Sequence, residues 1–453
     1  MATYKTPGVY VEEISKLPPS VAEVSTAVPA FIGCTANGPT ADDTGKVVPV
    51  VKRIDTLLDY ETLFGGANPS AFTVAAGADP SQPGAISRVV PAFDYLLYYS
   101  LSLYFKNGGG SCYIVSIGNY AAAPLKSQFE AGLAALEKED EPTLILLTDA
   151  INLSAADYYD LAQQVLAQCE KLGDRFAILD VIDSAGVSDF RTNIGTNSLK
   201  YGAAYYPSVQ TTLTYVYQAD QITLKSSSSD KKATDTTLAA IVSTNTALYN
   251  QVKTALAQQR INLPSSSAVA GIYASVDRER GVWKAPANVS LSSVIGPLVK
   301  ITADDQENLN VDPTAGKSIN AIRAFTGKGT LVWGARTLAG NDNEWRYVSV
   351  RRLFNMIEES AQKASSFAVF EPNDAATWLK VRAMIESYLY GLWQQGALAG
   401  PTPDDAYFVN VGLGKTMTPQ DVLEGRLIVE IGIAAVRPAE FIILRFMHKL
   451  QQA

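Results

Sequence analysis

The chain has 453 residues and a net charge of −8, with 47% hydrophobic and 18% charged residues. This composition excludes a largely disordered protein. The acidic balance, without any basic cluster longer than two residues, argues against a nucleic-acid-binding protein. The sequence has a single histidine, His448, which argues against acid–base, nucleophilic or zinc chemistry because most such sites use histidine.

The cysteines and the hydropathy pattern indicate the compartment in which the chain is made. Cys34, Cys112 and Cys169 lie far apart, which fits buried, reduced thiols better than a disulfide framework. The N-terminus lacks the apolar core of a signal peptide, and no run of about 18 apolar residues could span a membrane. We therefore expect assembly in the cytoplasm, no membrane insertion and, for work outside the cell, release by another route such as lysis.

The N-terminal residues 4–14 form a short extended segment. Val9, Tyr10 and Val11 favour a β-strand, Glu12 follows them, and the prolines at 18–19 separate the segment from what comes next. Two interpretations remain open. The segment is either an edge strand of the domain's own sheet or an arm that adds a strand to a neighbouring molecule.

The next hundred residues combine strands with glycine-rich turns. Residues 26–37 predict a buried strand and a turn, residues 67–90 an exposed loop, and residues 93–105 a helix. The glycines at 108–110 come directly before a strand. A phosphate-binding loop has the opposite order, with the strand first and a helix after it, so we interpret these glycines as a structural turn.

Residues 128–183 carry the clearest α/β pattern. Residues 143–147 and 176–180 are apolar runs typical of buried parallel strands. Between them a helix begins after Ser154 and ends at Gly173, which predicts a βαβ unit. Asp149, Asp180 and Asp183 lie at strand ends, where α/β proteins often bind ligands. A metal would need more converging ligands than these, so we expect no such site.

The middle of the chain is more polar. Residues 201–209 predict another strand, and residues 210–262 a solvated region with a serine tract at 226–229 and a helix around 238–258. Residues 277–280 alternate Asp, Arg, Glu and Arg. We interpret them as a charged network rather than a catalytic carboxylate pair, because neighbouring arginines keep carboxylates ionised.

The C-terminal part predicts two helices over 347–396, followed by two strands. The second helix begins after Asp374 and carries one apolar stripe: Trp378, Val381, Ile385, Tyr388, Leu389 and Leu392. The strands, 427–433 and 441–447, are separated by Pro438. The last strand is apolar on both faces, and no later segment could pair with it. We therefore expect its ladder partner to come partly from another copy.

Several sequence motifs, in this order, resemble those of contractile tail sheath proteins of myophages, R-type pyocins and phage-like extracellular injection particles. The resemblance covers most of the chain except roughly 67–90 and 210–262. The residues that carry it are Thr6–Glu13, Val28–Gly33, Leu63–Gly66, Asn107–Gly110, Pro264–Asn288, Glu307–Asn310, Ile319–Arg323, Leu331–Leu338, Trp345–Phe354 and Val369–Asp374.

The resemblance implies an α/β fold with a subtilisin-like sheath core, an α+β C-terminal domain, and extended N- and C-terminal β arms for strand pairing between subunits. The expected domains are an N-terminal arm (1–20), a core (21–345) with exposed insertions near 67–90 and 210–262, and a C-terminal domain (346–453). The C-terminal domain includes a β arm at 426–453.

The resemblance also implies a mechanism and partners. Hexameric rings stack helically around an inner tube in a metastable extended state, and contraction drives the tube through a target envelope. The expected partners are other copies, the inner tube protein, baseplate proteins, tail-terminator or cap proteins, and sister sheath proteins. We expect no cofactor, no nucleic acid and function in a virion tail or a released extracellular particle.

Two groups of residues are the candidate contacts of such a subunit. A helix of the C-terminal domain faces the tube in sheath proteins, which makes Lys380 and Arg382 candidate tube contacts, with Arg351 and Arg352 as second choices. The candidate residues of the intersubunit arms are Val9, Tyr10, Val11, Glu12, Leu427, Val429, Ile431, Ile433, Phe441, Ile442, Ile443, Leu444 and Phe446.

Two other classes of function were weighed against a sheath: a subtilisin-like hydrolase and another self-assembling shell or tube protein. A hydrolase triad needs a histidine beside its nucleophile, but His448 lies near the end of the chain and no Gly-x-Ser-x-Gly motif occurs. The sequences at 316–318 and 414–416 end like phosphate loops, yet Val311 and Val409 replace the required first glycine. We therefore expect no enzymatic activity, and the motifs favour a sheath over a small tube protein.

Overall fold

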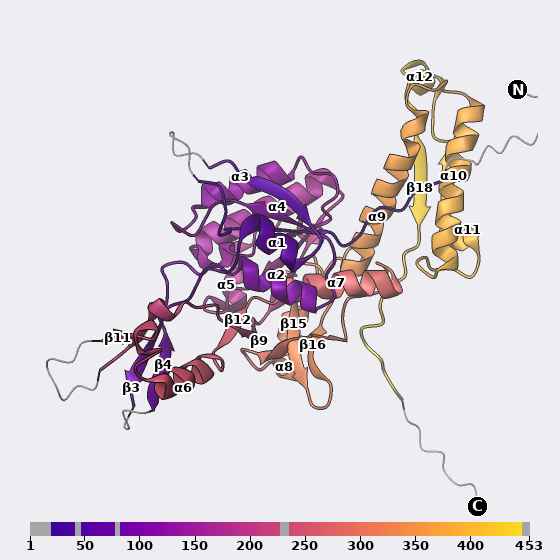
Figure 1. The fold of residues 1–453 in the computed structure, drawn as a ribbon. Helices are drawn as coiled ribbons and strands as arrows, with labels where there is room; N and C mark the ends of the chain where they lie inside the picture. The colour runs from indigo at the N-terminus through magenta and orange to yellow at the C-terminus, as the bar shows by residue number, and fades with distance from the viewer. Residues whose placement is uncertain (1–19, 41–46, 78–81, 227–234, 446–453) are drawn as a thin grey trace, which may run out of the picture. The chain divides into compact units, whose positions relative to one another are not determined.

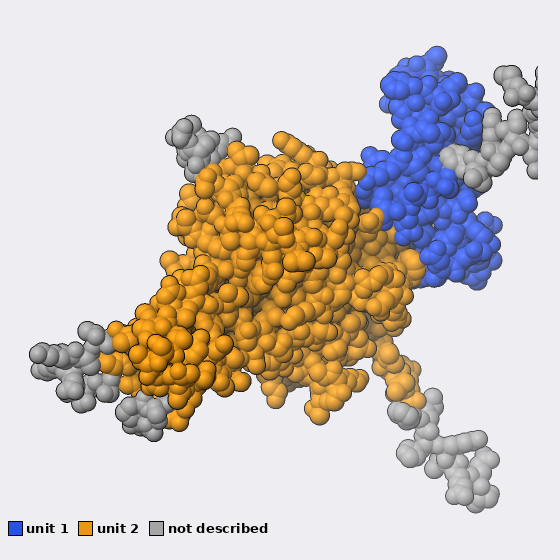
Figure 2. All heavy atoms as spheres, in the orientation of Figure 1, with its two compact units in different colours: residues 1–24, 357–436 blue, residues 25–356, 437–453 orange. Residues whose placement is uncertain are grey.

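The computed structural model describes residues 20–40, 47–77, 82–226 and 235–445. The chain divides into two compact units, which Figure 2 colours separately. The small unit comprises residues 1–24 and 357–436, and the large unit comprises residues 25–356 and 437–453.

A nine-stranded sheet forms the centre of the large unit (Figure 1). Its strand order is β13-β16-β15-β8-β7-β6-β1-β5-β2. The six middle strands are parallel: β1 (Pro29–Gly33), β5 (Cys112–Ser116), β6 (Leu144–Leu146), β7 (Phe176–Asp180), β8 (Gly202–Tyr206) and β15 (Ile319–Phe325). The antiparallel strands at the edges are β2 (Val50–Ile54), β16 (Gly329–Trp333) and β13 (Val289–Ser290).

Helices cover both faces of this sheet, because the middle strands are apolar on both alternating faces. Phe31 and Ile114 pack in one core with α1 (Leu57–Phe64), α2 (Leu97–Lys106) and α7 (Ser266–Arg280). The other core contains Ile32, Val115 and residues of α3 (Lys126–Leu136), α4 (Ala155–Leu172), α5 (Gly186–Asn193) and α8 (Ala303–Asn310). The three layers confirm the predicted α/β class.

The predicted βαβ unit is β6–α4–β7, and its helix begins and ends where expected. The Ser154 hydroxyl accepts a hydrogen bond from the Asp157 N–H, which satisfies one free donor of the first turn. Gly173 ends α4 with a positive φ of 74°, a conformation that costs glycine little. The strands pair in parallel, with Leu144 opposite Phe176.

Residues 67–90 are not the exposed loop that we predicted. They form a hairpin, β3 (Phe72–Ala76) and β4 (Pro83–Arg88), which joins β10 (Ile222–Leu224) and β11 (Thr236–Thr237) in one sheet. Helix α6 (Thr246–Leu256) packs on it, and Figure 1 shows α6 beside β3 and β4. We call β3, β4, β10, β11 and α6 the insertion lobe. Both expected insertions therefore contribute to one folded element.

The insertion lobe has its own apolar core, which explains the error. Phe72 and Val74 are buried because Ile222 and Leu224 pair beside them from a segment far along the chain. The remaining core residues are Leu238, Val252 and Leu256. The helix is shorter than predicted, since Asn245 caps its first turn. A further three-stranded sheet connects β9 (Val209–Thr214), β12 (Arg260–Leu263) and β14 (Val294–Pro297).

The small unit contains helices around a two-stranded antiparallel sheet. Helix α9 (Val348–Ala364) contributes residues to both units, and α10 (Ala375–Gln394) begins after Asp374, whose carboxylate accepts two backbone N–H groups. The sheet pairs β17 (Tyr407–Val411) with β18 (Val429–Ile433). The short helices are α11 (Pro403–Ala406) and α12 (Pro419–Leu423).

Candidate assembly surfaces

Strand β18 has a ladder partner that the sequence analysis did not identify. Val429 lies opposite Val411, and Ile433 lies opposite Tyr407, so the earlier strand β17 pairs with the segment 427–433 from within the chain. Gly432 is required here, because a Cβ at this position would lie 2.1 Å from the Phe408 ring. Strand β18 is therefore paired on one edge within its own chain, and the assignment of Leu427, Val429, Ile431 and Ile433 to an intersubunit arm stays a prediction.

The segment after Glu440 behaves differently. Residues 441–445 belong to no strand, and Phe441, Ile442, Ile443 and Leu444 are 70–79% exposed. Four large apolar side chains in a row are thus exposed on the chain by itself, which is unusual for a solvent-facing segment. The predicted strand 441–447 is not formed within its described part. Phe446 and the N-terminal candidates Val9, Tyr10, Val11 and Glu12 lie outside the described residues.

The two cations proposed as tube contacts lie on α10. Lys380 is exposed, and Arg382 forms an exposed ion pair with Glu386, with 2.8 Å between Nε and Oε1. The same helix buries Val381, Ile385, Leu389 and Leu392, which confirms the apolar stripe. Lys380 and Arg382 therefore stay available as surface contacts.

Arg351 is not available as a surface contact. It is 2% exposed, its guanidinium stacks 4.3 Å from the Trp345 ring centre, and its Nε donates to Asn355 at 2.7 Å. Cation–π stacking and hydrogen bonding thus occupy the group inside the large unit.

Arg352 is also buried, at 3% exposure. Its guanidinium donates to Asp277 and, at 2.8 Å, to the carbonyl of Thr26, and the Thr26 hydroxyl donates to Asp277 at 2.6 Å. Asp277 is therefore part of a charged network, as predicted, but the cation that pairs with it is Arg352, and Arg278 donates to the Gly108 carbonyl instead. Burial also removes Arg351 and Arg352 as tube contacts, because a buried side chain committed to internal partners cannot reach another protein.

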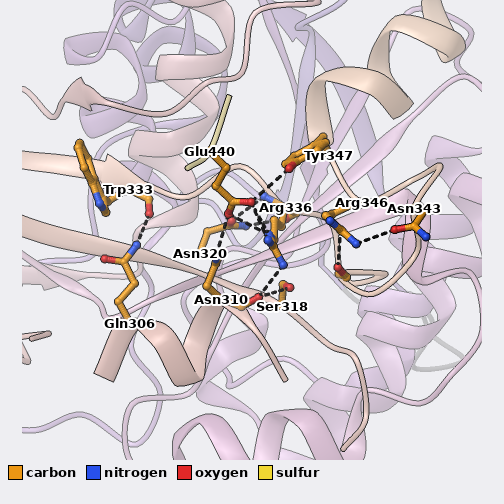
Figure 3. Close-up of polar contacts among 11 residues, drawn as sticks. Gln306, Asn310, Ser318, Asn320, Trp333, Arg336, Asn343, Arg346, Tyr347 and Glu440 are labelled. Atoms are coloured by element: carbon orange, nitrogen blue, oxygen red, sulfur yellow. Dashed lines mark hydrogen bonds and ion pairs between the residues drawn. The ribbon is translucent and has the colours of Figure 1, made fainter. Parts of the chain in front are cut away.

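A cluster of polar side chains holds Glu440, the residue directly before the exposed segment (Figure 3). Arg336 donates to both carboxylate oxygens, with distances of 2.9 Å from Nε to Oε1 and 2.6 Å from Nη2 to Oε2. The Asn310 amide donates to Oε1 at 2.7 Å, and the Tyr347 hydroxyl to Oε2 at 3.2 Å. Burial raises the pKa of Glu440, but the hydrogen bonds from Arg336 and Asn310 outweigh it and hold the pKa below its ordinary value.

Arg336 is itself fixed by the core of the large unit. Its backbone N–H donates to the Asn320 side chain, and the Asn320 amide donates back to its carbonyl, both at 2.8 Å. Its Nη1 donates to the Asn310 carbonyl at 3.2 Å. Asn320 belongs to β15 and is 1% exposed, whereas Arg336 is 4% exposed. We call Arg336, Asn310, Tyr347 and Glu440 the Glu440 anchor. The sequence analysis missed it, since only folding brings these positions together.

A groove lies next to the Glu440 anchor within the large unit. Its volume is about 750 Å³, and its lining includes Lys284, Arg323, Trp333, Phe441 and Ile442. Burial lowers the pKa of Lys284, and Arg323 is held by Gln306 at 2.6 Å. Apolar side chains with flanking cations are typical of a surface that binds a polypeptide rather than of a reaction centre.

The acidic residues at the strand ends accept hydrogen bonds from backbone N–H groups. Both oxygens of Asp149 are occupied by the N–H groups of Cys34, Leu96 and Leu97 at 2.7–3.0 Å. Asp180 accepts from the N–H of Ser266, and Asp183 from that of Ser208. No group of three or more histidine, cysteine or acidic residues in the described part of the chain could hold a metal ion. None of the described helices is long and apolar enough to cross a bilayer.

Comparison with known proteins identifies the relatives of this chain. Residues 340–448 match the phage tail sheath C-terminal domain family. The tail sheath protein of Vibrio phage KVP40 is 25% identical over 186 residues, or 41% of this chain and 26% of that protein. The tail sheath protein of Enterobacteria phage T4 is 26% identical over 129 residues, 28% of this chain and 19% of that protein. The matched regions thus span about a quarter or less of these two curated relatives.

Solved structures match the chain over nearly its full length. The contracted sheath complex of the extracellular contractile injection system PVC has 34% identity, a TM-score of 0.66 and 99% coverage of both chains. The contracted helical sheath of the anti-feeding prophage has 32% identity and a TM-score of 0.67, and the match covers 99% of this chain and all of that one. A chain of the anti-feeding prophage baseplate matches equally well, with 32% identity and a TM-score of 0.67. The protein therefore belongs to the contractile tail sheath family.

Proposed function

We propose that this protein is the structural subunit of a contractile sheath, which polymerises helically around an inner tube and contracts to drive that tube through a target envelope. The observation that carries the proposal is the exposed segment 441–444. Burying one such side chain is worth about 1.5–3 kcal/mol, so four of them provide a strong drive toward association. A chain that exposes them on its own is suited to assembly with further copies.

Strand addition is the mode of association that we infer. The sheet of β17 and β18 has only two strands in the described chain, so a further strand at its edge would pair backbone groups that now have no ladder partner. After the end of β18, the Ala399 N–H donates to the Ala434 carbonyl and the Val436 N–H donates to the Ala397 carbonyl. Along residues 429–433, however, the edge of β18 that faces away from β17 has no strand beside it in the described chain. We infer that arms of neighbouring copies, residues 9–12 and 441–446, add to this sheet.

Repetition of one such head-to-tail contact generates a helical polymer, because the contact does not close on itself. Contraction would then draw on interfaces that improve in the short state, and a kinetic barrier would hold the long state until a baseplate signal arrives. In this mechanism the arms hinge while the units move as rigid bodies. It needs neither a cofactor nor a nucleotide.

The remaining partners and the setting belong to the same proposal. Lys380 and Arg382 on α10 contact the inner tube, baseplate and cap proteins meet the ends of the cylinder, and sister sheath proteins share it. Assembly takes place in the cytoplasm, and the finished particle is a virion tail or a released extracellular particle. The role is structural rather than enzymatic, and the subtilisin-like topology of the core remains a prediction from the resemblance.

Electron microscopy of the purified protein, alone and with its tube protein, tests the proposal. We expect hollow cylinders with a wide lumen from the wild type. The double variant Ile442→Asp/Ile443→Asp should remain a folded monomer, because both side chains are 77–79% exposed, yet form no cylinders. The control Val90→Asp changes an equally exposed residue, at 82%, and should assemble normally. Wild-type protein that forms no cylinder under any condition with tube would contradict the proposal.

A further inference from the structure

Glu440 is the last residue of the described chain whose side chain is hydrogen-bonded to the core of the large unit. The Glu440 side chain is 22% exposed, whereas the next four side chains are 70–79% exposed. Glu440 is therefore the last polar attachment of the described C-terminal segment to its own subunit, and beyond it Phe441 and Ile442 line the groove while staying largely exposed. Pro438, which separates the two predicted strands, lies two residues before Glu440.

The Glu440 anchor fixes direction as well as position. Arg336 holds the carboxylate through two parallel N–H donors, and this fork aligns the planes of both groups. Asn310 and Tyr347 occupy the remaining acceptor positions of the two oxygens. These contacts leave the carboxylate little freedom to rotate. Because the side chain is fixed, the backbone of Glu440 is also restricted in position and direction.

Arg336 has partners in the core of the large unit besides Glu440. Arg336 is held by its paired bonds to Asn320 on the central sheet, and its guanidinium is also bonded to the Asn310 carbonyl. The Arg336 side chain is 5% exposed with Glu440 bound, so Glu440 is the counter-ion of a buried cation, and removing one partner of such a pair is destabilising. The anchor is thus a required partner of the core.

The anchor also shortens the free segment. Before it, the last backbone hydrogen bond to the segment is that from Val436 to the Ala397 carbonyl. Arg437 adds only a contact of its exposed side chain to the Asn343 carbonyl. If Glu440 were released, residues 437–440 would join the free segment and lengthen its reach by roughly 13 Å at 3.3–3.6 Å per residue. A longer tether lowers the effective concentration of the arm at any one neighbour.

We propose that the Glu440 anchor sets the exit point and direction of the apolar segment 441–444 and thereby selects which neighbouring copy of this chain receives it. Glu440 and Arg336 are in this sense positioning residues for assembly, and the segment after them makes the contact. The inference rests on the proposed function, because it takes a second copy as the occupant.

Label distances on the monomer test the anchor directly. Nitroxides at Ile443→Cys and Asp304→Cys report the distance between the segment and α8, and the three native cysteines are buried and leave the labelling specific. With Glu440 intact we expect one narrow distance distribution. Glu440→Gln removes the charge and puts an amide donor against Arg336, so the width should at least double. Tyr347→Phe, which removes one hydroxyl contact, should give an intermediate width in a fully folded protein.

Cylinder yield provides the second readout. Glu440→Gln should lower the fraction of protein in regular cylinders at least tenfold, with the remainder monomeric or irregular. The control Glu137→Gln breaks an exposed ion pair with Lys171 in the same unit and should leave both the yield and the label distance unchanged. An unchanged narrow distribution in Glu440→Gln and Tyr347→Phe, or a wild-type cylinder yield from Glu440→Gln, would overturn the inference. Absence of cylinders from the wild type would instead contradict the proposed function, while the label distances still decide the anchor.

Discussion

Asp149 shows how a single carboxylate organises the strand ends of the large unit. It is fully buried and accepts backbone N–H groups from the end of β1 and the start of α2. Gly33 makes this approach possible, since a Cβ there would lie 2.5 Å from an Asp149 oxygen. Burial raises the pKa of Asp149 to about 7, although its three N–H donors act in the opposite direction.

This raised pKa predicts a pH dependence of stability. The folded carboxyl binds its proton more tightly than the unfolded one, whose ordinary pKa is about 3.9. The free energy of unfolding should therefore fall as the pH rises from about 4 to 7, by about 1.4 kcal/mol per pH unit at most, and level off above 7. Asp149→Asn should be less stable throughout, because its amide faces the Cys34 N–H, but its stability should change less between pH 5 and 8. Thermal unfolding of both proteins at several pH values measures how the free energy of unfolding changes with pH. The same change in the wild type and in Asp149→Asn would contradict the prediction.

Arg352 and Arg382 allow a second comparison of single residues. Arg352→Ala leaves the buried Asp277 carboxylate without its cation, which should cost about 3–5 kcal/mol. Arg382→Ala breaks only the exposed pair with Glu386 on α10 and should cost below about 0.5 kcal/mol. Urea unfolding of both variants provides the comparison. Similar losses would mean that the Asp277 site is more solvated than its geometry indicates.

Single-residue roles were predictable where the determinant is local. Ser154, Gly173 and Asp374 define helix ends through bonds to residues within four positions, and these were predicted correctly. Arg351 and Arg352 were predicted as tube contacts because of their charge. They are buried instead, because Trp345, Thr26 and Asp277, which lie outside their helix, pack against or pair with them. The Glu440 anchor needs positions 130 and 104 residues apart in sequence, which no spacing pattern reveals.

At the scale of elements, the insertion lobe is an independent cluster of strands and one helix. Phe72 is 1% exposed and packs against residues of β10 and α6. Phe72→Ala should destabilise this lobe by about 3–5 kcal/mol, because it opens a cavity in a small core. Hydrogen exchange should accelerate in β3, β4, β10 and α6, while the nine-stranded sheet keeps its protection. Uniform acceleration over the whole large unit would show that the lobe is not a separate cooperative element.

The elements predicted correctly from the sequence are those whose own residues show a clear hydrophobic pattern, without the need to know which segments pack against them. β6 and β7 are apolar on both faces and read as buried parallel strands without knowledge of their neighbours. β3 has only two residues on its buried face, Phe72 and Val74. The strand that pairs with it, β10, is only three residues long, so neither strand has a strong hydrophobic pattern in the sequence. β17 was missed for a related reason: its buried Val409 and Val411 alternate with polar or exposed positions, a weak signal without β18 beside it.

At the scale of the whole molecule, the proposed contact with the inner tube lies on the surface of α10. Reversing the charges with Lys380→Glu and Arg382→Glu should weaken co-assembly with the tube by at least tenfold, because exposed cations contribute mainly to long-range attraction. Polymerisation without the tube should change less than twofold. Sedimentation of cylinders formed with and without tube protein measures both. Equal losses in the two assays would place these residues in contacts between sheath subunits instead.

The α/β class of the whole molecule and its family could be predicted, whereas the exchange of terminal segments between its units could not. The alternation of apolar strands and amphipathic helices over 128–183 is enough for the class. The units, however, exchange segments: residues 437–453 belong with residues 25–356, although the preceding 80 residues form the other unit. Such an exchange depends on contacts like that of Glu440 with Arg336, which appear only in three dimensions.

The pairing of β3 with β10 has a consequence for the order of events during synthesis. Thr73 lies opposite Thr223, so the β3–β4 hairpin leaves the ribosome about 150 residues before the strand that completes its sheet. At roughly 5–20 residues per second, the hairpin waits on the order of ten seconds or more with Phe72 and Val74 uncovered. The nascent chain therefore carries an unpaired, apolar strand edge for much of its translation, and this interval is when a chaperone or a slower codon stretch would most affect the yield of native subunits.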